Sequence, residues 1–142
     1  MTQATFDDVR LVLKLYDMRR EPRLREARRW FAASFKVKTL AELTKLCPAG
    51  SEENASYRQV ITYYEMVASF ITSGVLDAQL FYQSGRELLL VWERLRDVLP
   101  EIRAANRNPL EYRNLELVAA GFIEWWNSQA PGAYQAFSQR VR

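Results

Sequence analysis

Six arginines within residues 19–29 form the densest group of side chains that could do chemistry. Guanidinium groups bind phosphate and carboxylate oxygens through paired hydrogen bonds, and the Trp30 ring beside them could stack on a nucleobase. Two interpretations stay open: the cluster binds nucleic acid or another polyanion, or it is a solvated basic face with local ion pairs to Glu21 and Glu26. The six residues are Arg19, Arg20, Arg23, Arg25, Arg28 and Arg29.

Glu65 is the only formal charge between Arg58 and Asp77, in a stretch whose apolar residues indicate a helix covered nearly all round. A carboxylate enclosed there needs a partner, or its pKa rises. The alternatives are a general acid or base in a polar pocket, and a structural ion pair or a carboxylate that reaches the helix edge. By elimination, the candidate partners are Arg86, Arg103 and Arg107.

The chain of 142 residues has no histidine and a single cysteine, Cys47. These counts exclude nucleophile systems that need an imidazole, zinc sites built from histidine or several cysteines, and an intramolecular disulfide. The carboxylates do not converge, and no glycine-rich phosphate loop is present. We therefore assign no catalytic residue, no metal site and no cofactor, and we expect Cys47 to be inert at a helix end.

The helices carry more apolar residues than one buried stripe requires. In the first helix we expect the core-facing stripe to be Phe6, Val9, Val12, Leu13 and Tyr16. The surplus apolar residues lie on the first helix and on the helix that follows Asp77. They could pack inside the bundle or form the self-complementary face of a homodimer, and both alternatives stay open. These residues are Leu11, Leu15, Met18, Tyr82, Leu89 and Leu90.

Apolar residues recur with helical periodicity, and proline and glycine residues mark the ends of these segments, so the sequence predicts an all-α fold with no sheet. Thr5 and Asp77 are N-cap candidates, Pro22 suits a first helical turn, and Thr39 with Glu42 has the spacing of a capping box. We expect a single-domain antiparallel bundle of about five to seven helices. The expected helices cover residues 6–18, a stretch from 22, a short stretch after 39, 56–73, 78–99, a short turn after 100, a stretch after 109, and 132–141, with the clearest loop at 48–54.

The net charge of +3 is unevenly distributed, because residues 1–46 carry five excess positive charges and the remainder carries two excess negative charges. Within the single domain, residues 1–142, we distinguish this basic part, a less charged core part at 55–128 and a short C-terminal helix. No secretory signal or membrane span is visible, since polar residues interrupt the most apolar segment, 59–76. We therefore expect a cytoplasmic protein.

The centre of the chain resembles a bacterial family of small helical proteins classed as a domain of unknown function. The resemblance covers about residues 57–116 and implies a helical fold and a bacterial source, with no catalytic residue or cofactor to carry over. It depends on Tyr-Tyr-Glu at 63–65, Ser-Gly-Val-Leu-Asp at 73–77, Val-Trp-Glu at 91–93, and Pro-Glu-Ile-Arg at 100–103 with Arg107.

Three functions are compatible with these patterns. We favour a non-enzymatic interaction or structural module that self-associates as a homodimer through its surplus apolar residues. The first alternative is polyanion or nucleic-acid binding through the Arg19–Arg29 cluster, which ranks second because the overall charge is modest. The second alternative is a small-ligand protein or enzyme, which requires a cleft where Glu65 and at least one arginine converge.

Overall fold

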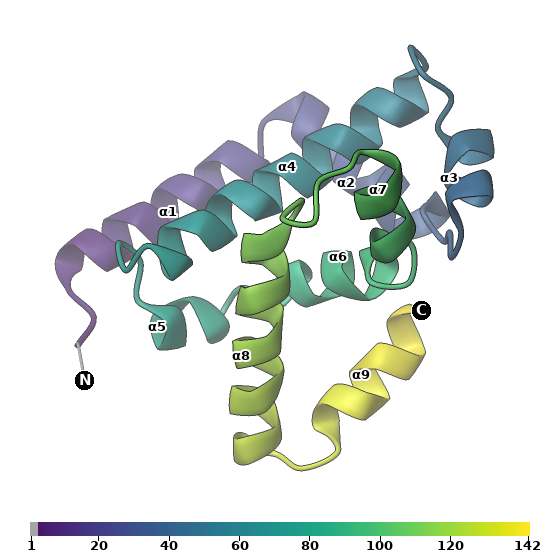
Figure 1. The fold of residues 1–142 in the computed structure, drawn as a ribbon. Helices are drawn as coiled ribbons and strands as arrows, with labels where there is room; N and C mark the ends of the chain where they lie inside the picture. Colours follow the sequence, from purple (N-terminus) through teal and green to yellow (C-terminus); the bar gives the residue numbers. More distant parts are fainter. Residues whose placement is uncertain (1–2) are drawn as a thin grey trace.

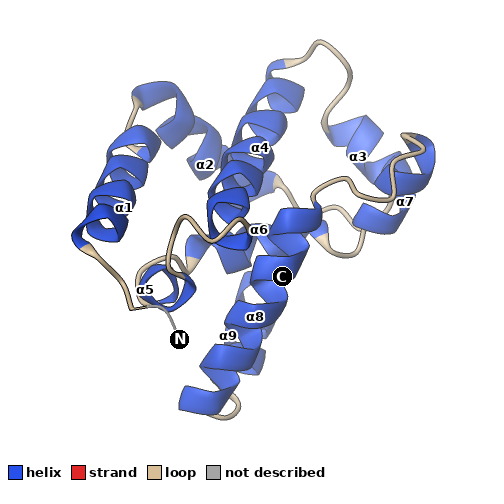
Figure 2. Cartoon of the chain, turned by 60° about the vertical axis from the view of Figure 1, so that its left-hand side comes forward, coloured by secondary structure: helices blue, strands red, loops and turns tan. Residues whose placement is uncertain are grey.

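The computed structural model describes residues 3–142, and every regular element within that range is a helix (Figures 1 and 2). The all-α prediction is confirmed. The described range contains nine helices rather than five to seven, because short helical turns are separate elements and one expected helix is divided. The helices are α1 (Phe6–Arg19), α2 (Pro22–Ser34), α3 (Leu40–Leu46), α4 (Glu52–Thr72), α5 (Ala78–Tyr82), α6 (Glu87–Leu95), α7 (Leu99–Ala105), α8 (Arg113–Gln129) and α9 (Ala133–Val141).

Local sequence signals determine where four helices begin. Thr5 and Thr39 each form a capping box. In each box the threonine hydroxyl accepts from the backbone N–H of the acidic residue three positions later, and the carboxylate of that residue accepts from the backbone N–H of the threonine. Pro22 occupies the first turn of α2, where its missing N–H costs nothing. The Asp77 carboxylate accepts from the N–H of Leu80 and caps α5. All four predicted starts are confirmed.

Two helix boundaries differ from the expectation. The helix expected at 56–73 already begins at Glu52, because the Ser51 hydroxyl caps it by accepting from the N–H of Asn54. The helix expected at 78–99 is divided between α5 and α6. At the break, a Cβ on Gly85 would lie 2.3 Å from the Phe81 ring, so only glycine lets the backbone approach that ring so closely.

Helix α4 lies at the centre of the molecule, with α2 packed on one side and α8 on another (Figure 2). The interface with α2 contains a stack of aromatic rings: Phe35 lies between Phe31 and Tyr57, with ring centroids 4.6 and 5.1 Å apart. Stacks of this kind fix the α2–α4 distance. The helices left at the periphery are α1 on one flank, α3 with α7 on the opposite one, and α9 against α6 and α8 (Figure 1).

A membrane span was not expected from the sequence. Among the helices formed by residues 3–142, none combines the length and the apolar character needed to cross a bilayer.

Candidate functional site

Helix α1 buries only part of the face that we expected: Val12 packs at the edge of the core and Tyr16 is half-buried, but the best-buried residue is Leu15 on the other face. Leu15 is 5% exposed, whereas Phe6 is 85% and Leu13 64% exposed. Val9 is also exposed, so Phe6, Val9 and Leu13 form an outward apolar row, here called the α1 stripe. The expectation was wrong for these three residues because both faces of α1 are apolar, and periodicity does not say which one meets α4.

The other surplus residues are mostly used inside the molecule. Leu89 is fully buried, and Leu11 and Leu90 pack at the edge of the core. The Tyr82 ring stacks on Phe122 at 4.5 Å. Met18 is exposed, but it lies away from the α1 stripe. The predicted set therefore does not form one surface.

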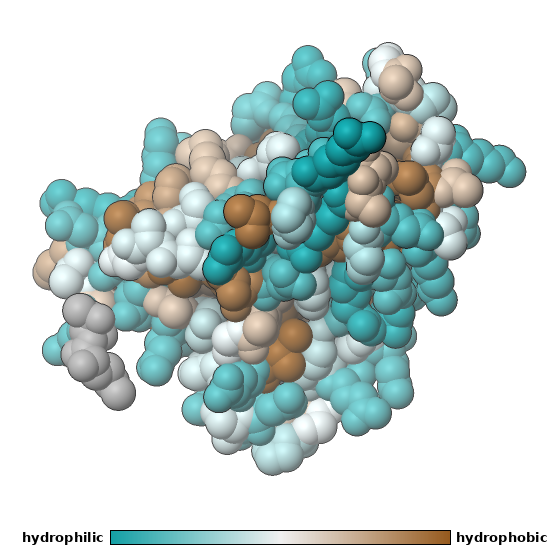
Figure 3. Space-filling view, in the orientation of Figure 1, coloured by the Kyte–Doolittle hydropathy of each residue, from teal (hydrophilic) through white to brown (hydrophobic). Residues whose placement is uncertain are grey.

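Apolar residues also reach the surface elsewhere. On the face shown in Figure 3 they lie in separate patches over the α1–α4 end and over α8, with hydrophilic residues between them. Val75, Leu110 and Leu117 are the other exposed large apolar residues besides Met18 and the α1 stripe. Single exposed apolar residues are ordinary on a protein surface, whereas Phe6, Val9 and Leu13 lie in a row on one helix.

The structure divides the arginine cluster into two groups. Arg28 binds both carboxylate oxygens of Glu87 on α6, with Nε–Oε1 at 2.6 Å and Nη2–Oε2 at 2.8 Å. Arg19 donates to the Tyr64 hydroxyl, which in turn donates to Glu87 at 2.6 Å. These four residues form the Glu87 cluster, which ties α1, α2, α4 and α6 together.

The charges in the Glu87 cluster stabilise one another. Burial raises the pKa of Glu87, but hydrogen bonds from Arg28 and Tyr64 and the positive charges of Arg28 and Arg19 outweigh it, so the net pKa is lowered. The hydrogen bond to Glu87 likewise raises the pKa of Arg28. Two of the six predicted anion-binding arginines are thus internal ion-pair partners. The other four, Arg20, Arg23, Arg25 and Arg29, are exposed.

Glu65 has a structural partner, and that partner is not an arginine. Its carboxylate accepts from the backbone N–H groups of Asn114 and Leu115, at 3.3 and 2.8 Å, and from the Asn114 amide at 2.9 Å. Helix α8 needs this cap because Tyr112, its N-cap residue, has φ 57° and provides no side-chain cap of its own. Glu65 therefore places a negative charge at the N-terminus of α8, where the helix dipole favours it.

The expected pairing of Glu65 with Arg86, Arg103 or Arg107 is wrong. Arg86 lies over the Trp126 ring, with its guanidinium carbon 4.5 Å from the centroid. Arg103 binds the Glu111 carbonyl and the Glu116 carboxylate. Arg107 is exposed in a left-handed turn. The cleft that an active site around Glu65 would require is therefore not formed by these residues.

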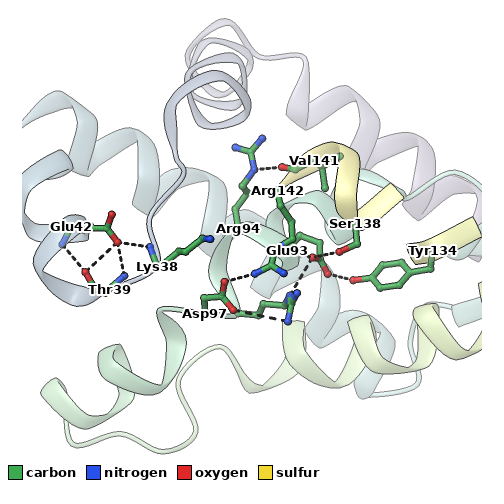
Figure 4. A network of polar contacts seen from close by, with 11 residues as sticks. Lys38, Thr39, Glu42, Glu93, Arg94, Asp97, Tyr134, Ser138, Val141 and Arg142 are labelled. Carbon is green, nitrogen blue, oxygen red and sulfur yellow. Dashed lines mark hydrogen bonds and ion pairs between the residues drawn. The ribbon is translucent and has the colours of Figure 1, made fainter. Parts of the chain in front are cut away.

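Sequence reasoning missed two of the three buried charged residues in the described range, Glu93 and Arg94 on α6, which are 4% and 7% exposed. The Glu93 carboxylate accepts from the Tyr134 hydroxyl and, at 2.6 Å, from the Ser138 hydroxyl of α9 (Figure 4). Arg142 approaches the same carboxylate at 3.9 Å. Glu93 thereby holds α9 against the rest of the fold.

Arg94 lies beside Glu93 and binds four backbone carbonyls. It donates to the carbonyls of Phe31, Ala32 and Phe35 at the end of α2. It also donates to the carbonyl of Val141 at the end of α9 (Figure 4). The last carbonyls of a helix lack hydrogen-bond partners within that helix and carry partial negative charge. A guanidinium supplies the missing donors and the compensating positive charge. The sequence did contain a signal for this buried pair, because Glu93 and Arg94 are adjacent charges within an otherwise apolar helical stretch. Glu93 also belongs to the Val-Trp-Glu segment of the resemblance.

No buried side-chain nitrogen or oxygen lacks a hydrogen-bond partner in the part of the chain that the structure describes. Burial raises the pKa of Cys47 to about 11, and its side chain is 4% exposed at the end of α3, which keeps the thiol protonated and unreactive. The enclosed polar groups are thus occupied by structural contacts, and the surface is where free groups lie.

One protein-family model matches residues 4–125, from the segment before α1 to near the end of α8. No curated protein and no solved structure matches this chain. The family match includes the segments that carry the resemblance and extends it toward the N-terminus. Since the match covers more than half of the residues, the chain belongs to the family described as Domain of unknown function (DUF4760).

Proposed function

We propose that this protein is a non-enzymatic interaction module that forms a homodimer by pairing its α1 stripe with that of a second copy. The observation that carries the proposal is the exposure of Phe6 and Leu13, 85% and 64%, on a helix that its capping box and its buried Leu15 hold in place. A fixed helix with an apolar row on its outer side suits helix-to-helix packing.

The charges that flank the stripe favour an antiparallel pair. Asp7 lies near the start of α1, and Arg10 and Lys14 lie one and two turns farther on. In a parallel pair each residue would face its own copy, so like charges would meet. In an antiparallel pair the acidic end of one helix faces the basic part of the other, which agrees with a two-fold symmetric dimer.

The size of the surface suggests a weak dimer. An α-helix of the length of α1, 14 residues, spans about 21 Å. Stable interfaces bury about 1,200–2,000 Å² in total, and a contact through one such helix per copy lies at or below the lower end of that range. Association should therefore depend on protein concentration.

Sedimentation velocity over a concentration series tests the proposal. We expect the full chain to shift from monomer to dimer, and the Leu13→Glu variant to stay monomeric. The matched control is Leu117→Glu, which places the same charge at an exposed leucine on α8 and should leave the dimer intact. Charge variants then test the orientation: Asp7→Lys should weaken the dimer, and Asp7→Lys with Lys14→Asp should restore it.

A chain that sediments as a monomer at every concentration would contradict the proposal. So would a Leu117→Glu variant that dissociates as readily as Leu13→Glu, because the stripe would then have no special role.

A further inference from the structure

A groove between the start of α2 and the outer side of α4 brings together two arginines that are far apart in the sequence, Arg23 and Arg58. It encloses about 1100 Å³, including the space at its open mouth. Its other lining residues are small or carry neutral polar groups: Gly50, Ser51, Asn54, Ala55, Gln59 and Thr62. None of these described lining residues is a carboxylate, so Arg23 and Arg58 carry the formal charges of the lining.

The two guanidinium groups are available for a ligand. Arg23 and Arg58 are both exposed, and neither guanidinium group forms a salt bridge or a hydrogen bond with any residue in the range 3–142. The Thr62 hydroxyl contacts Arg58 only at its backbone carbonyl, to which it donates. Arg28, only five residues after Arg23, instead has both of its outer nitrogens on Glu87 or on a backbone carbonyl. Glu21, two residues before Arg23, accepts from the Leu24 N–H and caps α2. Hydrogen bonds from the backbone of Leu24 and Arg23 lower the pKa of Glu21, and the charge of Arg23 is a further cause that lowers it.

Acidic residues limit how large a bound anion can be. A neighbouring hollow shares Arg23, Ala55 and Gln59 with the groove, and its remaining lining includes three carboxylates and the Trp30 ring. An extended polyanion that continued from the groove along α2 would meet these carboxylates, which repel it. They are Glu26, Glu52 and Glu53.

We propose that the Arg23–Arg58 groove binds a compact small molecule with two or more phosphoryl groups, independently of the pairing through α1. Each guanidinium presents a planar fork that matches two phosphate oxygens, and arginines from two helices match two phosphoryl groups on one ligand. The Gln59 amide, on the same wall of α4, supplies a neutral donor. The acidic neighbours make nucleic acid the disfavoured occupant, although the arginines alone would suit it.

Isothermal titration with inorganic tripolyphosphate at low salt tests the groove. We expect saturable binding of one tripolyphosphate per chain, and about tenfold weaker binding in Arg23→Gln and in Arg58→Gln, because each loses a charge-assisted contact. The matched control is Arg29→Gln, which removes the same charge from the exposed side of α2 outside the groove and should bind nearly as the unmodified chain does. Circular dichroism of each variant verifies the fold.

A second arm distinguishes the ligand classes. A single-stranded oligonucleotide should bind more weakly than tripolyphosphate, and the Glu52→Gln/Glu53→Gln variant should narrow that difference. The proposal is overturned if tripolyphosphate does not bind at low salt, or if Arg29→Gln weakens binding as much as Arg58→Gln. Tighter binding of the oligonucleotide would also overturn it, because the anion surface would then be extended.

Discussion

Arg94 and Arg23 are the same residue type in opposite surroundings. Arg94 lies in the corner where α2, α6 and α9 meet, is 7% exposed, and donates to four backbone carbonyls. Arg23 lies on the outer side of α2, is exposed, and has no side-chain partner within the described range. The first region uses its charges to hold helices together, and the second leaves them available.

The contrast teaches where stability and binding are located. Four charged residues form hydrogen bonds with a helix end or with a neighbouring side chain, and these contacts stabilise the fold: Glu65, Glu87, Glu93 and Arg94. The α1 stripe and the side chains of Arg23 and Arg58 contribute little to the fold, because they face solvent. Substitutions in the two regions should therefore separate cleanly into changes of stability and changes of association.

The largest difference should come from replacing each arginine by methionine, which keeps an unbranched apolar stem. Arg94→Met leaves the carbonyls at the ends of α2 and α9 unpaired, and we expect a loss of about 4 kcal/mol in the free energy of unfolding. Arg23→Met should change that free energy by less than about 0.5 kcal/mol. Urea denaturation measures both. Equal effects at the two positions would remove the distinction between the regions.

An effect of intermediate size should distinguish the two faces of α1. Leu15→Ala opens a cavity beneath the helix and should cost about 3 kcal/mol of unfolding free energy. Leu13→Ala, two residues earlier, should cost less than about 0.5 kcal/mol when the protein is dilute enough to be monomeric. If Leu13→Ala proves the more destabilising variant, the outward direction assigned to the α1 stripe is incorrect.

The smallest effect should appear in the pH dependence of the Glu87 cluster. The folded-state pKa of Glu87 is lowered, so its contribution is complete above the unfolded-state pKa, near 4.5, and is lost as the pH falls through the lower folded value. Urea denaturation at pH 7 and at pH 3 should show this loss for the unmodified chain and a smaller loss for Glu87→Gln. The control is Glu124→Gln, which removes an exposed carboxylate from α8. Its loss of unfolding free energy between pH 7 and pH 3 should equal that of the unmodified chain.

Sequence patterns predicted the helices well because the signals for a helix start are local. Thr5, Thr39 and Asp77 form their caps with residues three positions away. The division of the helix expected at 78–99 was not predicted, because a single glycine such as Gly85 is tolerated within a helical pattern and does not by itself indicate a break.

The candidate sites were less predictable, for a physical reason that Glu65 illustrates. Its isolation among apolar residues correctly indicated that it needs a partner, and the sequence offered only cations for that role. The actual partners include two backbone N–H groups about fifty positions later. Every residue except proline has such a group, so composition cannot single them out.

The sequence by itself determined an all-helical chain, most of its helix starts, and the exclusion of histidine-dependent and multi-cysteine chemistry, because these follow from residue types and short-range spacing. The tertiary structure decided which face of α1 is buried, and which arginines are held by Glu87 and which are exposed. It also decided that Arg23 and Arg58 share a groove. A guanidinium is equally suited to an internal carboxylate and to an external phosphate, and only the neighbours brought to it by folding determine which one it meets.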